Sequence, residues 1–436
     1  MKYLHLLVSL CLCCGFTLPS MADGVDTLRQ QDPALVTRIV FDNSRSEVPY
    51  RIPALVQTRD GKLIADCDYR ISKTDVGYSN RNGLHRIDNV YKVSYDNGRT
   101  WSEPMYAACG DEHASEEWRT AFGDPCMVAD RTGDNVLLQT TSGKVGYFSS
   151  VRTNPQHNVF FHSSDNGVTW DNGTDLTEMI YGLYDGKLPG GVSPAGIFLT
   201  SGRIMQSRYI KTGDFYRLYI AHPLRTDSVN KFASYVIYSD DFGHNWKVLG
   251  GPEVIPSDAA DESKVEELPD GSVLLSCRNQ TGGRQFNVFT YSDASKAEGT
   301  WGKSVTPPNM SGEYVNACNG EILVVPAVRK TDGKQLYVAI QSVPLSTERK
   351  DVGFYYKELA SPADYHTPEA LSAGWVKALQ VSHTSSCYST MILMQNRHIG
   401  FLYEEELSNE GYNIVFKELT LEAITEGQYR MGNFDR

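Results

Sequence analysis

An eight-residue pattern that recurs along the chain constrains its fold more than any other feature. It reads SYDNGRTW from Ser94 to Trp101, SSDNGVTW from Ser163 to Trp170 and SDDFGHNW from Ser239 to Trp246. In such an octet the Asp and Asn can bond back to nearby amides, the Gly permits a positive φ, and the Trp can pack over the turn. We predict that each octet is a structural hairpin turn, which makes its aspartate a poor candidate for catalysis.

The spacing of the octets predicts repeated units. Asp96 and Asp165 are 69 residues apart, and Asp165 and Asp241 are 76 residues apart. A degraded fourth copy, YSDASKAEGTW, ends at Trp301, and a fifth survives only as a segment that ends at Trp375. Repeats of this length, each with room for four strands, are typical of propeller blades rather than of a short-period solenoid. Division of the chain into blades of about 65 to 70 residues gives about six of them.

The segments between the octets have the rhythm of an all-β protein. Short alternating runs such as GKLIADCDYR and GSVLLSCRN are separated by turn pairs such as Asp60-Gly61. Helical periodicity is weak, and Ser361–Gly374 is the best short candidate for a helix. Since no stretch resembles a linker, we predict a single all-β domain over residues 23–436: a six-bladed β-propeller of four-stranded antiparallel blades with octet turns.

The first residues have the pattern of an export signal. Lys2 precedes an apolar run from Leu4 to Leu18, and small residues follow at Ser20 and Ala22. A run of about 15 apolar residues is shorter than the roughly 20 that span a bilayer, so we interpret residues 1–22 as a removed signal peptide rather than an anchor. The protein is then expected in the periplasm, on the cell surface or outside the cell, without a transmembrane segment. Residues 23–45 are a candidate N-terminal arm.

Net charge and cysteine spacing limit the binding partners and cofactors that the protein is expected to have. A formal net charge of −12 argues against nucleic acid or an anionic membrane as the main partner. Six cysteines lie outside the leader, spread singly through strand-like runs, and we predict that most of them are free buried thiols. No pair has metal-ligand spacing, so no metal or other cofactor is expected. The six are Cys67, Cys109, Cys126, Cys277, Cys318 and Cys387.

Two segments carry charged residues that a plain propeller does not need. In YRIPALVQTRDGKLIADCDYRISKTD, Arg51 opens one apolar strand, Arg70 closes the next, and Asp75 follows five residues later. In STERKDVGFYYKE, Arg349 stands just before an aromatic strand, with Lys350 beside it. Arginines at strand ends are ordinarily surface residues, so these positions gain interest only in combination with others.

Two later segments add carboxylates and a tyrosine. Glu262 and Arg278 stand at opposite ends of a predicted hairpin, in DESKVEELPDGSVLLSCRN, where Glu266 and Glu267 compete with Glu262 for any catalytic role. In SSCYSTMILMQNRHIGFLYEEE, Tyr388 starts one strand, and a Tyr-Glu pair ends its partner. A lone tyrosine in a β protein is normally part of the core.

Taken together and in this order, the four segments and the octets, which are known as Asp-boxes, resemble the exo-sialidase family from about Tyr50 to Glu404. The resemblance implies that three arginines surround the substrate carboxylate and that a fourth lies in the pocket. It also implies an acid/base aspartate, a tyrosine nucleophile and a glutamate that assists it. By this resemblance the three arginines are Arg51, Arg278 and Arg349, and the fourth is Arg70. The acid/base aspartate is Asp75, the nucleophile is Tyr388, and the assisting glutamate is Glu262. Arg329 and Lys350 compete with Arg349 for its place.

The chemistry of the implied substrate accounts for these residue types. A sialic acid carries a carboxylate on its anomeric carbon, which planar guanidinium groups can bind in bidentate fashion. The same carboxylate would repel an anionic nucleophile, whereas a neutral tyrosine avoids the repulsion but, with an ordinary pKa of about 10, needs a base such as Glu262. Sialidases are a known exception to catalysis by two carboxylates. Asp75 would protonate the leaving oxygen and then activate water, with net retention of configuration.

The resemblance therefore implies a secreted retaining exo-α-sialidase, expected to act as a monomer on sialylated glycans, glycoproteins or glycolipids. Three alternatives remain open. The related sugar acids Kdn and Kdo carry the same carboxylate, a trans-sialidase would transfer the sugar to another sugar, and a non-catalytic propeller would only bind carbohydrate. The last alternative does not require a tyrosine, a glutamate and an aspartate beside three arginines.

Overall fold

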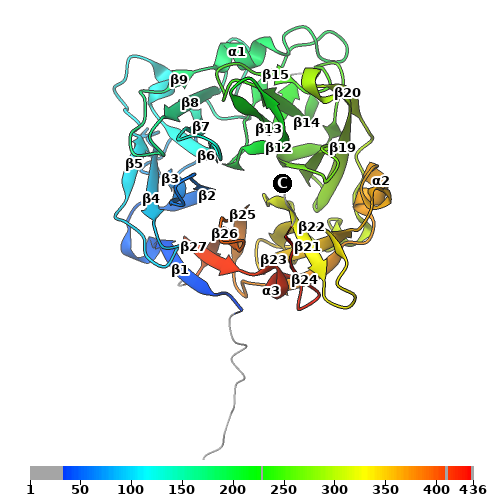
Figure 1. Ribbon diagram of the computed structural model, residues 1–436. Helices are drawn as coiled ribbons and strands as arrows, with labels where there is room; N and C mark the ends of the chain where they lie inside the picture. The colour runs from blue at the N-terminus through cyan, green and yellow to red at the C-terminus, as the bar shows by residue number, and fades with distance from the viewer. Residues whose placement is uncertain (1–32, 227–228, 408–410, 434–436) are drawn as a thin grey trace, which may run out of the picture. The chain divides into compact units, whose positions relative to one another are not determined.

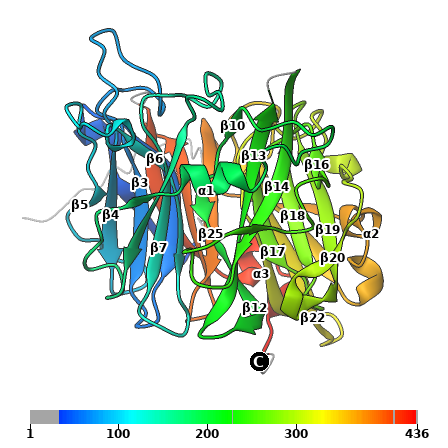
Figure 2. The ribbon, with the colours of Figure 1, turned by 90° about the horizontal axis from the view of Figure 1, so that it is seen from above.

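The computed structural model describes residues 33–226, 229–407 and 411–433. The predicted signal peptide and the first part of the predicted arm, residues 23–32, lie outside these residues. Within them, six separate β-sheets are arranged as blades around a central axis (Figure 1). Seen from above, the strands of neighbouring blades stand side by side (Figure 2). The prediction of a six-bladed all-β propeller is confirmed.

Each blade contains four antiparallel strands, which we number from the axis outward. The innermost strands are β2 (Tyr50–Gln57), β6 (Phe122–Ala129), β12 (Met205–Thr212), β17 (Ala260–Glu267), β21 (Ile322–Arg329) and β25 (Ser386–Leu393). The second strands are β3 (Leu63–Tyr69), β7 (Val136–Ser142), β13 (Phe215–Thr226), β18 (Val273–Asn279), β22 (Gln335–Pro344) and β26 (Ile399–Glu406). The third strands are β4 (Asp88–Ser94), β8 (His157–Ser163), β14 (Val229–Ser239), β19 (Arg284–Asp293), β23 (Val352–Leu359) and β27 (Tyr412–Leu419). The outermost strands are β5 (Met105–Ala108), β9 (Thr174–Asp175), β15 (Lys247–Val248), β20 (Glu298–Trp301), β24 (Val376–Gln380) and β1 (Val36–Phe41).

Short elements complete the blades. The further strands are β10 (Gly196–Ile197), β11 (Gly202–Arg203), β16 (Ser257–Asp258) and β28 (Tyr429–Met431). The α-helices are α1 (Thr177–Gly182), α2 (Pro368–Ser372) and α3 (Leu421–Ile424). The 3₁₀ turns are η1 (Asn43–Arg45), η2 (Glu117–Arg119), η3 (Ala294–Lys296), η4 (Pro308–Met310) and η5 (Pro362–Asp364). The expected helical segment within Ser361–Gly374 thus contains η5 and α2. No helix among the described residues has the length and apolar character needed to cross a membrane.

The ring is closed by strands from both ends of the chain. β1 pairs antiparallel with β27, with Val36 opposite Glu418 and Ile39 opposite Val415. The sixth blade therefore takes its outermost strand from the N-terminal region and its other three strands from the C-terminal region. From residue 33 onward, the segment expected to be an arm is a structural part of the propeller, because β1 supplies hydrogen bonds that β27 would otherwise lack.

The octets form the same turn between the third and fourth strands of the first three blades. In the second octet, Ser163 Oγ donates to Asp165 Oδ1 at 2.7 Å, and Thr169 donates to both carboxylate oxygens of Asp165, at 2.9 Å from its amide and 2.6 Å from its hydroxyl. Asn166 and Gly167 adopt positive φ angles of 60° and 75°. Because Asp165 is committed to these bonds, the prediction of a structural turn is confirmed here.

The octet tryptophans also join neighbouring blades. Trp101, Trp170 and Trp246 pack against rings in the third strand of the preceding blade, with centroid distances of 5.5, 6.2 and 5.7 Å to Phe416, Tyr91 and Phe160, respectively. The contact between Trp101 and Phe416 crosses the seam where the ring closes. Trp375, which ends the degraded fifth copy, follows the same rule and stacks on Phe286 of the fourth blade at 5.0 Å.

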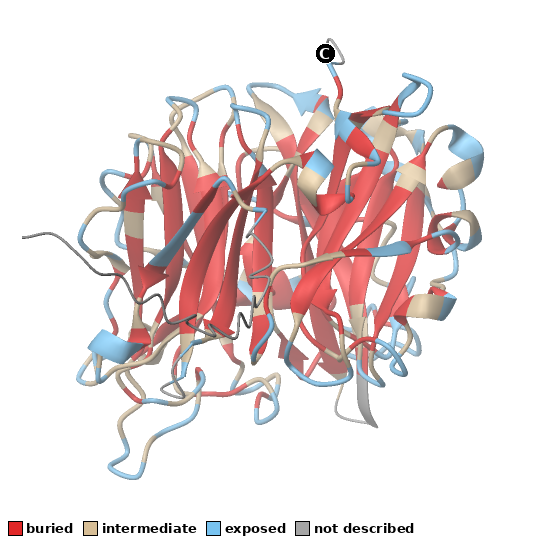
Figure 3. Cartoon of the chain, turned by 90° about the horizontal axis from the view of Figure 1, so that it is seen from below, coloured by how far each residue is buried: buried red, intermediate tan, exposed pale blue. Residues whose placement is uncertain are grey.

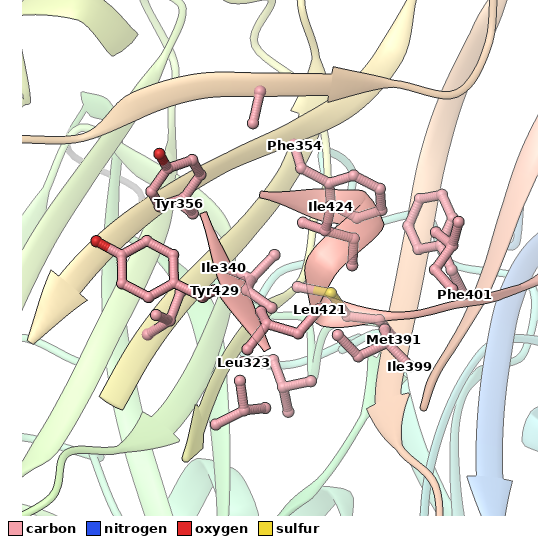
Figure 4. Packing of buried hydrophobic residues seen from close by; sticks show 14 of the residues in the cluster. Leu323, Ile340, Phe354, Tyr356, Met391, Ile399, Phe401, Leu421, Ile424 and Tyr429 are labelled. Carbon is pink, nitrogen blue, oxygen red and sulfur yellow. The ribbon is translucent and has the colours of Figure 1, made fainter. Parts of the chain in front are cut away.

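Buried apolar residues fill the spaces between blades. Most strand residues are buried along their whole length, while exposed residues concentrate in the connecting loops (Figure 3). Figure 4 shows the packing between the fifth and sixth blades, where Phe354 and Phe401 lie 4.8 Å apart and α3 contributes Leu421 and Ile424. Sheets buried on both faces need apolar residues on both, which explains why the strands contain continuous apolar runs such as ILVV in β21.

The direction of the strands places the octets at one end of the blades and the starts of the innermost strands at the other end. Along the first blade, β2 begins at Tyr50 and β3 returns to the same end, where Arg70 follows it. β4 then runs away again and ends at Ser94, where the octet begins. A seven-residue strand is about 23 Å long. The octet aspartates therefore lie at the far end of the blades from the starts of the innermost strands.

Replacement of Asp165 by Ala should weaken the protein without affecting the opposite face. Loss of an acceptor for several hydrogen bonds is expected to lower the free energy of unfolding by about 1–2 kcal/mol. Asp214→Ala is a matched control, because Asp214 is exposed in a surface turn. Urea denaturation of both variants measures the difference, and equal losses would contradict the assigned role.

The effect should also depend on pH. Burial opposes ionisation of Asp165, but the hydrogen bonds from Thr169, Ser163 and Val168 together outweigh it and lower the pKa to about 2. A depressed carboxyl pKa stabilises the folded state above the ordinary value of about 3.9, and the contribution disappears as the pH falls through 2. The stability difference between wild type and Asp165→Ala should therefore be constant above about pH 5 and shrink below about pH 4.

Candidate functional site

A pocket of about 370 Å³ lies at the end of the propeller where β2, β6, β17 and β25 begin. Loops and strand ends from all around the axis contribute to it. The lining residues are Arg51, Ile52, Asp75, Val76, Tyr78, Asp124, Tyr147, Phe148, Gln156, Phe198, Asp261, Glu262, Arg278, Arg349 and Tyr388. Convergence of strand ends on one face is what the propeller geometry provides, because each innermost strand approaches the axis.

Four innermost strands are distorted where they reach the pocket. Their pairing shifts register around Arg51 in β2, Asp124 in β6, Glu262 in β17 and Tyr388 in β25. Asp124 has a positive φ of 54°, which is uncommon for a residue other than glycine. A β-bulge adds a residue to one strand and re-aims nearby side chains. The bulges thus lie where each of these strands contributes charged or phenolic residues to the pocket.

Six of the seven predicted site residues line this pocket, although they are far apart in the sequence. They are Arg51, Asp75, Glu262, Arg278, Arg349 and Tyr388. The seventh, Arg70, lies beside the pocket and is buried. Arg70 forms an ion pair with Asp75 and a second, at 2.9 Å, with buried Asp68. Asp68 in turn accepts a 2.7 Å hydrogen bond from the amide of Asp124, so Arg70 connects the loop that carries Asp75 to the second blade.

The competing residues lie elsewhere. Glu266 is further along β17 and bonds Arg208 at 2.8 Å, and Glu267 accepts a hydrogen bond from Ser207. Arg329 forms an ion pair with Glu358 at 2.6 Å. Lys350 pairs with Glu348 at 2.8 Å. Of the residues that compete for the places of the catalytic glutamate and the third arginine, Glu262 and Arg349 are therefore the ones that reach the pocket.

Positive groups surround the phenol of Tyr388. Arg278 Nη1 is 3.5 Å from Tyr388 Oη and donates to Glu262 Oε2 at 2.5 Å. The guanidinium carbons of Arg51 and Arg349 lie 6.0 and 5.6 Å from the centroid of the Tyr388 ring. Burial, and then the negative charge of Glu262, raise the pKa of Tyr388 well above 10, although Arg278 and Arg349 oppose the shift. At neutral pH the phenol is therefore uncharged, and Arg278 connects it to the side chain of Glu262.

Arg51 is held in place by Glu404, a fully buried residue at the end of β26. Arg51 Nε and Nη2 donate to the two oxygens of Glu404 at 2.7 and 3.2 Å, and the amide of Ile52 donates at 2.8 Å. Burial alone would raise the pKa of Glu404, but the charge and hydrogen bonds of Arg51 outweigh it and lower the pKa. The Cys387 thiol and the amide of Tyr388 also donate to Glu404, at 2.7 and 3.4 Å. One carboxylate thus positions both Arg51 and the strand that carries Tyr388.

Arg349 differs from Arg51 and Arg278. Within the described residues its guanidinium has no hydrogen bond or ion pair, although it faces Tyr388. Arg51 and Arg278 use part of their donor capacity on Glu404 and Glu262. An arginine has five N–H donors, so all three retain donors for an anionic ligand.

Sequence reasoning missed a second group of residues that line the pocket. Tyr147, Phe148 and Phe198 form an aromatic wall, and Gln156 and Asp124 add polar atoms. Burial, and then the charge of Asp68, raise the pKa of Asp124. Phe148 keeps 64% of its surface exposed. Tyr147, Phe148, Gln156 and Phe198 come from loops without a recurring pattern, and Asp124 lies at the bulge in β6, so no sequence signal marked them. Glu404, in contrast, was visible as the end of a segment already singled out.

Comparison with known proteins agrees with this architecture. Residues 79–396 match the BNR repeat-like domain family. The chain belongs to the BNR repeat-like domain family. A match of this length covers most of the propeller, from the loop after β3 to the turn after β25.

This BNR repeat-like chain is also similar to several sialidases. It is 29% identical to a sialidase of Micromonospora viridifaciens over 308 residues, which cover 69% of the chain and 43% of that relative. A sialidase of Clostridium perfringens is 25% identical over 394 residues, covering 85% of the chain and 88% of the relative. The chain thus spans less than half the length of the first relative.

A solved structure, the Hadza microbial sialidase Hz136, superposes on the BNR repeat-like chain with a TM-score of 0.66 at 22% identity. The superposition covers 89% of this chain and 69% of the other. At this identity the likeness concerns the fold, and it extends over nearly the whole propeller.

Proposed function

We propose that the protein is a retaining exo-α-sialidase, a glycoside hydrolase that releases terminal α-linked sialic acids from glycans, glycoproteins or glycolipids. The observation that carries the proposal is the meeting of Arg51, Arg278 and Arg349 around Tyr388 in one pocket. The similarity to sialidases supports the same reading. A protein that only bound carbohydrate would have no use for a half-buried tyrosine hydroxyl that shares an arginine with a glutamate.

The three arginines would bind the carboxylate of the sugar. They come from the first, fourth and fifth blades and therefore approach a ligand from different sides. A carboxylate has about four lone-pair sites, and charge-assisted hydrogen bonds from guanidinium groups are roughly twice as strong as neutral ones. Binding the carboxylate here would set the anomeric carbon beside the Tyr388 hydroxyl.

Tyr388 would be the nucleophile and Glu262 its base. As the phenol attacks the anomeric carbon, Glu262 would take its proton, and the bond to the leaving oxygen would break in an oxocarbenium-like transition state. The nearby arginines stabilise the negative charge that develops on the phenolic oxygen, which offsets the unfavourable pKa of Tyr388 in the free protein. The product of this step is a tyrosyl glycoside.

Asp75 would be the acid and then the base. Its side chain is 67% exposed at the pocket while it pairs with Arg70, so a leaving group and an incoming water molecule can both reach it. It would protonate the leaving oxygen in the first step and deprotonate water in the second. Two successive displacements at one carbon give net retention.

Export completes the proposal. The leader pattern at residues 1–22 supports transfer out of the cytoplasm, where sialylated surfaces of other cells are accessible. No cofactor enters the proposed reaction, because the protein's own side chains supply the nucleophile, the base and the acid.

Removal of the Tyr388 hydroxyl should abolish turnover. We expect Tyr388→Phe to lower kcat on a fluorogenic sialic acid glycoside by at least about 1,000-fold, as removal of a nucleophile does elsewhere, with the fold unchanged. Tyr106→Phe is the matched control, since Tyr106 is an exposed tyrosine outside the pocket. Wild-type activity in Tyr388→Phe would refute the mechanism. Release of Kdn or Kdo without release of sialic acid would refute the substrate.

The arginines can be tested as a pair. Arg349→Ala should lower kcat/KM by about 10- to 100-fold, because it removes a charge-assisted hydrogen bond to the substrate carboxylate. Arg329→Ala should leave kcat/KM unchanged, since Arg329 is bound to Glu358 and Asp332 away from the pocket. Steady-state kinetics of both variants shows which of the two arginines binds the substrate carboxylate. A loss in Arg329→Ala without a loss in Arg349→Ala would show that the assignment of the third arginine is wrong.

A further inference from the structure

A second pocket, of about 220 Å³, lies at the other end of the propeller axis from the candidate functional site. Its lining includes Gln57, Ala129 and Leu393, which are the last residues of β2, β6 and β25, whereas the first pocket lies where these strands begin. Arg51 and Gln57 lie at opposite ends of β2, a separation of roughly 20 Å along the strand. The two pockets share no lining residue, so the second pocket is a separate site.

Three arginines and one carboxylate, Glu266, are the charged groups in the lining of the second pocket. The arginines are Arg131, Arg203 and Arg208. Glu266 Oε1 accepts a hydrogen bond from Arg208 at 2.8 Å, and Oε2 accepts one from Arg203 at 3.1 Å. Glu267 and Glu321 lie outside the lining and pair with Arg208 and Arg203 at 3.9 and 3.4 Å. Because both oxygens of Glu266 are already bound, the charged groups of the lining offer a ligand donors rather than acceptors.

Arg203 keeps donor groups that the protein does not use. Its Nη2 donates to Glu266 and Glu321 at 3.1 and 3.4 Å and to the carbonyl oxygen of Ile322 at 2.9 Å. Within residues 33–226, 229–407 and 411–433, no hydrogen bond leaves from its Nη1. The side chain is 12% exposed, and it lines the pocket. An arginine has five N–H donors, so Arg203 can still bind an acceptor in the pocket.

Lys264 adds a positive charge next to this arginine. Its side chain is 2% exposed, and Nζ has no hydrogen-bond partner in the part of the chain that the structure describes. Gly202, the residue before Arg203, gives the ammonium group space, because a Cβ at that position would lie 2.7 Å from Nζ. A buried cation is stabilised by a nearby negative charge. Lys264 therefore favours an anion over a neutral molecule in the adjoining pocket.

The remaining walls of the second pocket are mainly apolar. They include Met127, Ile204, Met205, Leu323 and Ile392. A sugar would bury hydroxyl groups against such walls without partners, which costs free energy, whereas an apolar body gains from the contact. A cavity of about 150 Å³ is large enough to bind benzene. The second pocket therefore has room for a body of that size together with a carboxylate group.

We propose that the second pocket is a binding site for a small organic carboxylate with an apolar body, such as an aromatic acid. The carboxylate accepts charge-assisted hydrogen bonds from Arg203 Nη1, with Lys264 behind it, and the apolar body packs against Met127, Ile204 and Ile392. Since these residues come from several blades, the bound acid also stabilises the folded propeller in proportion to its concentration. The site is independent of the proposed sialidase activity, because it uses none of the residues of that reaction.

Isothermal titration calorimetry of the full chain with benzoate tests the chemistry of the site. Benzamide is the matched neutral ligand, since it has the same ring and nearly the same shape but carries no charge. We expect saturable binding of benzoate and at least about tenfold weaker binding of benzamide, because hydrogen bonds between charged groups are roughly twice as strong as neutral ones. Absence of saturable benzoate binding, or equal affinity for the two ligands, would overturn the proposal.

Three variants test the location of the bound acid. Leu393→Asp places a negative charge in the lining at a residue that is 38% exposed, and it should weaken benzoate binding at least about fivefold by repulsion. Leu35→Asp is the matched control, since Leu35 is 55% exposed outside both pockets, and it should bind benzoate as wild type does. Arg349→Ala, which removes an arginine from the first pocket, should also retain binding. Loss of binding in Arg349→Ala with full binding in Leu393→Asp would place benzoate in the first pocket and contradict the proposal.

Discussion

The buried carboxylate of Glu404 is the interaction on which the rest of the site depends. It accepts hydrogen bonds from Arg51 and Ile52 of the first blade and from Cys387 and Tyr388 of the sixth. These two blades meet at the seam where β1 closes the ring. A buried charge is tolerated only where it is paired and hydrogen-bonded, so Glu404 and Arg51 require each other. The closure of the propeller and the geometry of the pocket are therefore linked through one side chain.

One end of the blades stabilises the packing between blades, and the other end forms the pocket. At one end, octet turns such as Ser163–Trp170 satisfy their own polar groups and place a tryptophan on the preceding blade. At the other end, bulges in β2, β6, β17 and β25 interrupt regular pairing. The regular turns at one end hold neighbouring blades together, and the bulges at the other end lie where charged side chains enter the pocket.

The sequence carried enough information for the blade count and for much of the pocket. The octets marked the third turn of a blade, and strand polarity then brought Arg51, Glu262 and Tyr388 to one face. The bulges could not be predicted, because a register shift depends on pairing between strands and leaves no spacing signal. The role of β1 was missed for the same reason, since its partner β27 is more than 370 residues away.

A crystal structure of a complex with a 2,3-unsaturated sialic acid analogue is the sharpest test of the proposed function, because it shows what the assembled pocket binds without any turnover. We expect the analogue's carboxylate to accept hydrogen bonds from Arg51, Arg278 and Arg349, with the Tyr388 hydroxyl next to the anomeric carbon. An analogue bound elsewhere, or bound in this pocket with its carboxylate turned away from the three arginines, would contradict the proposed function.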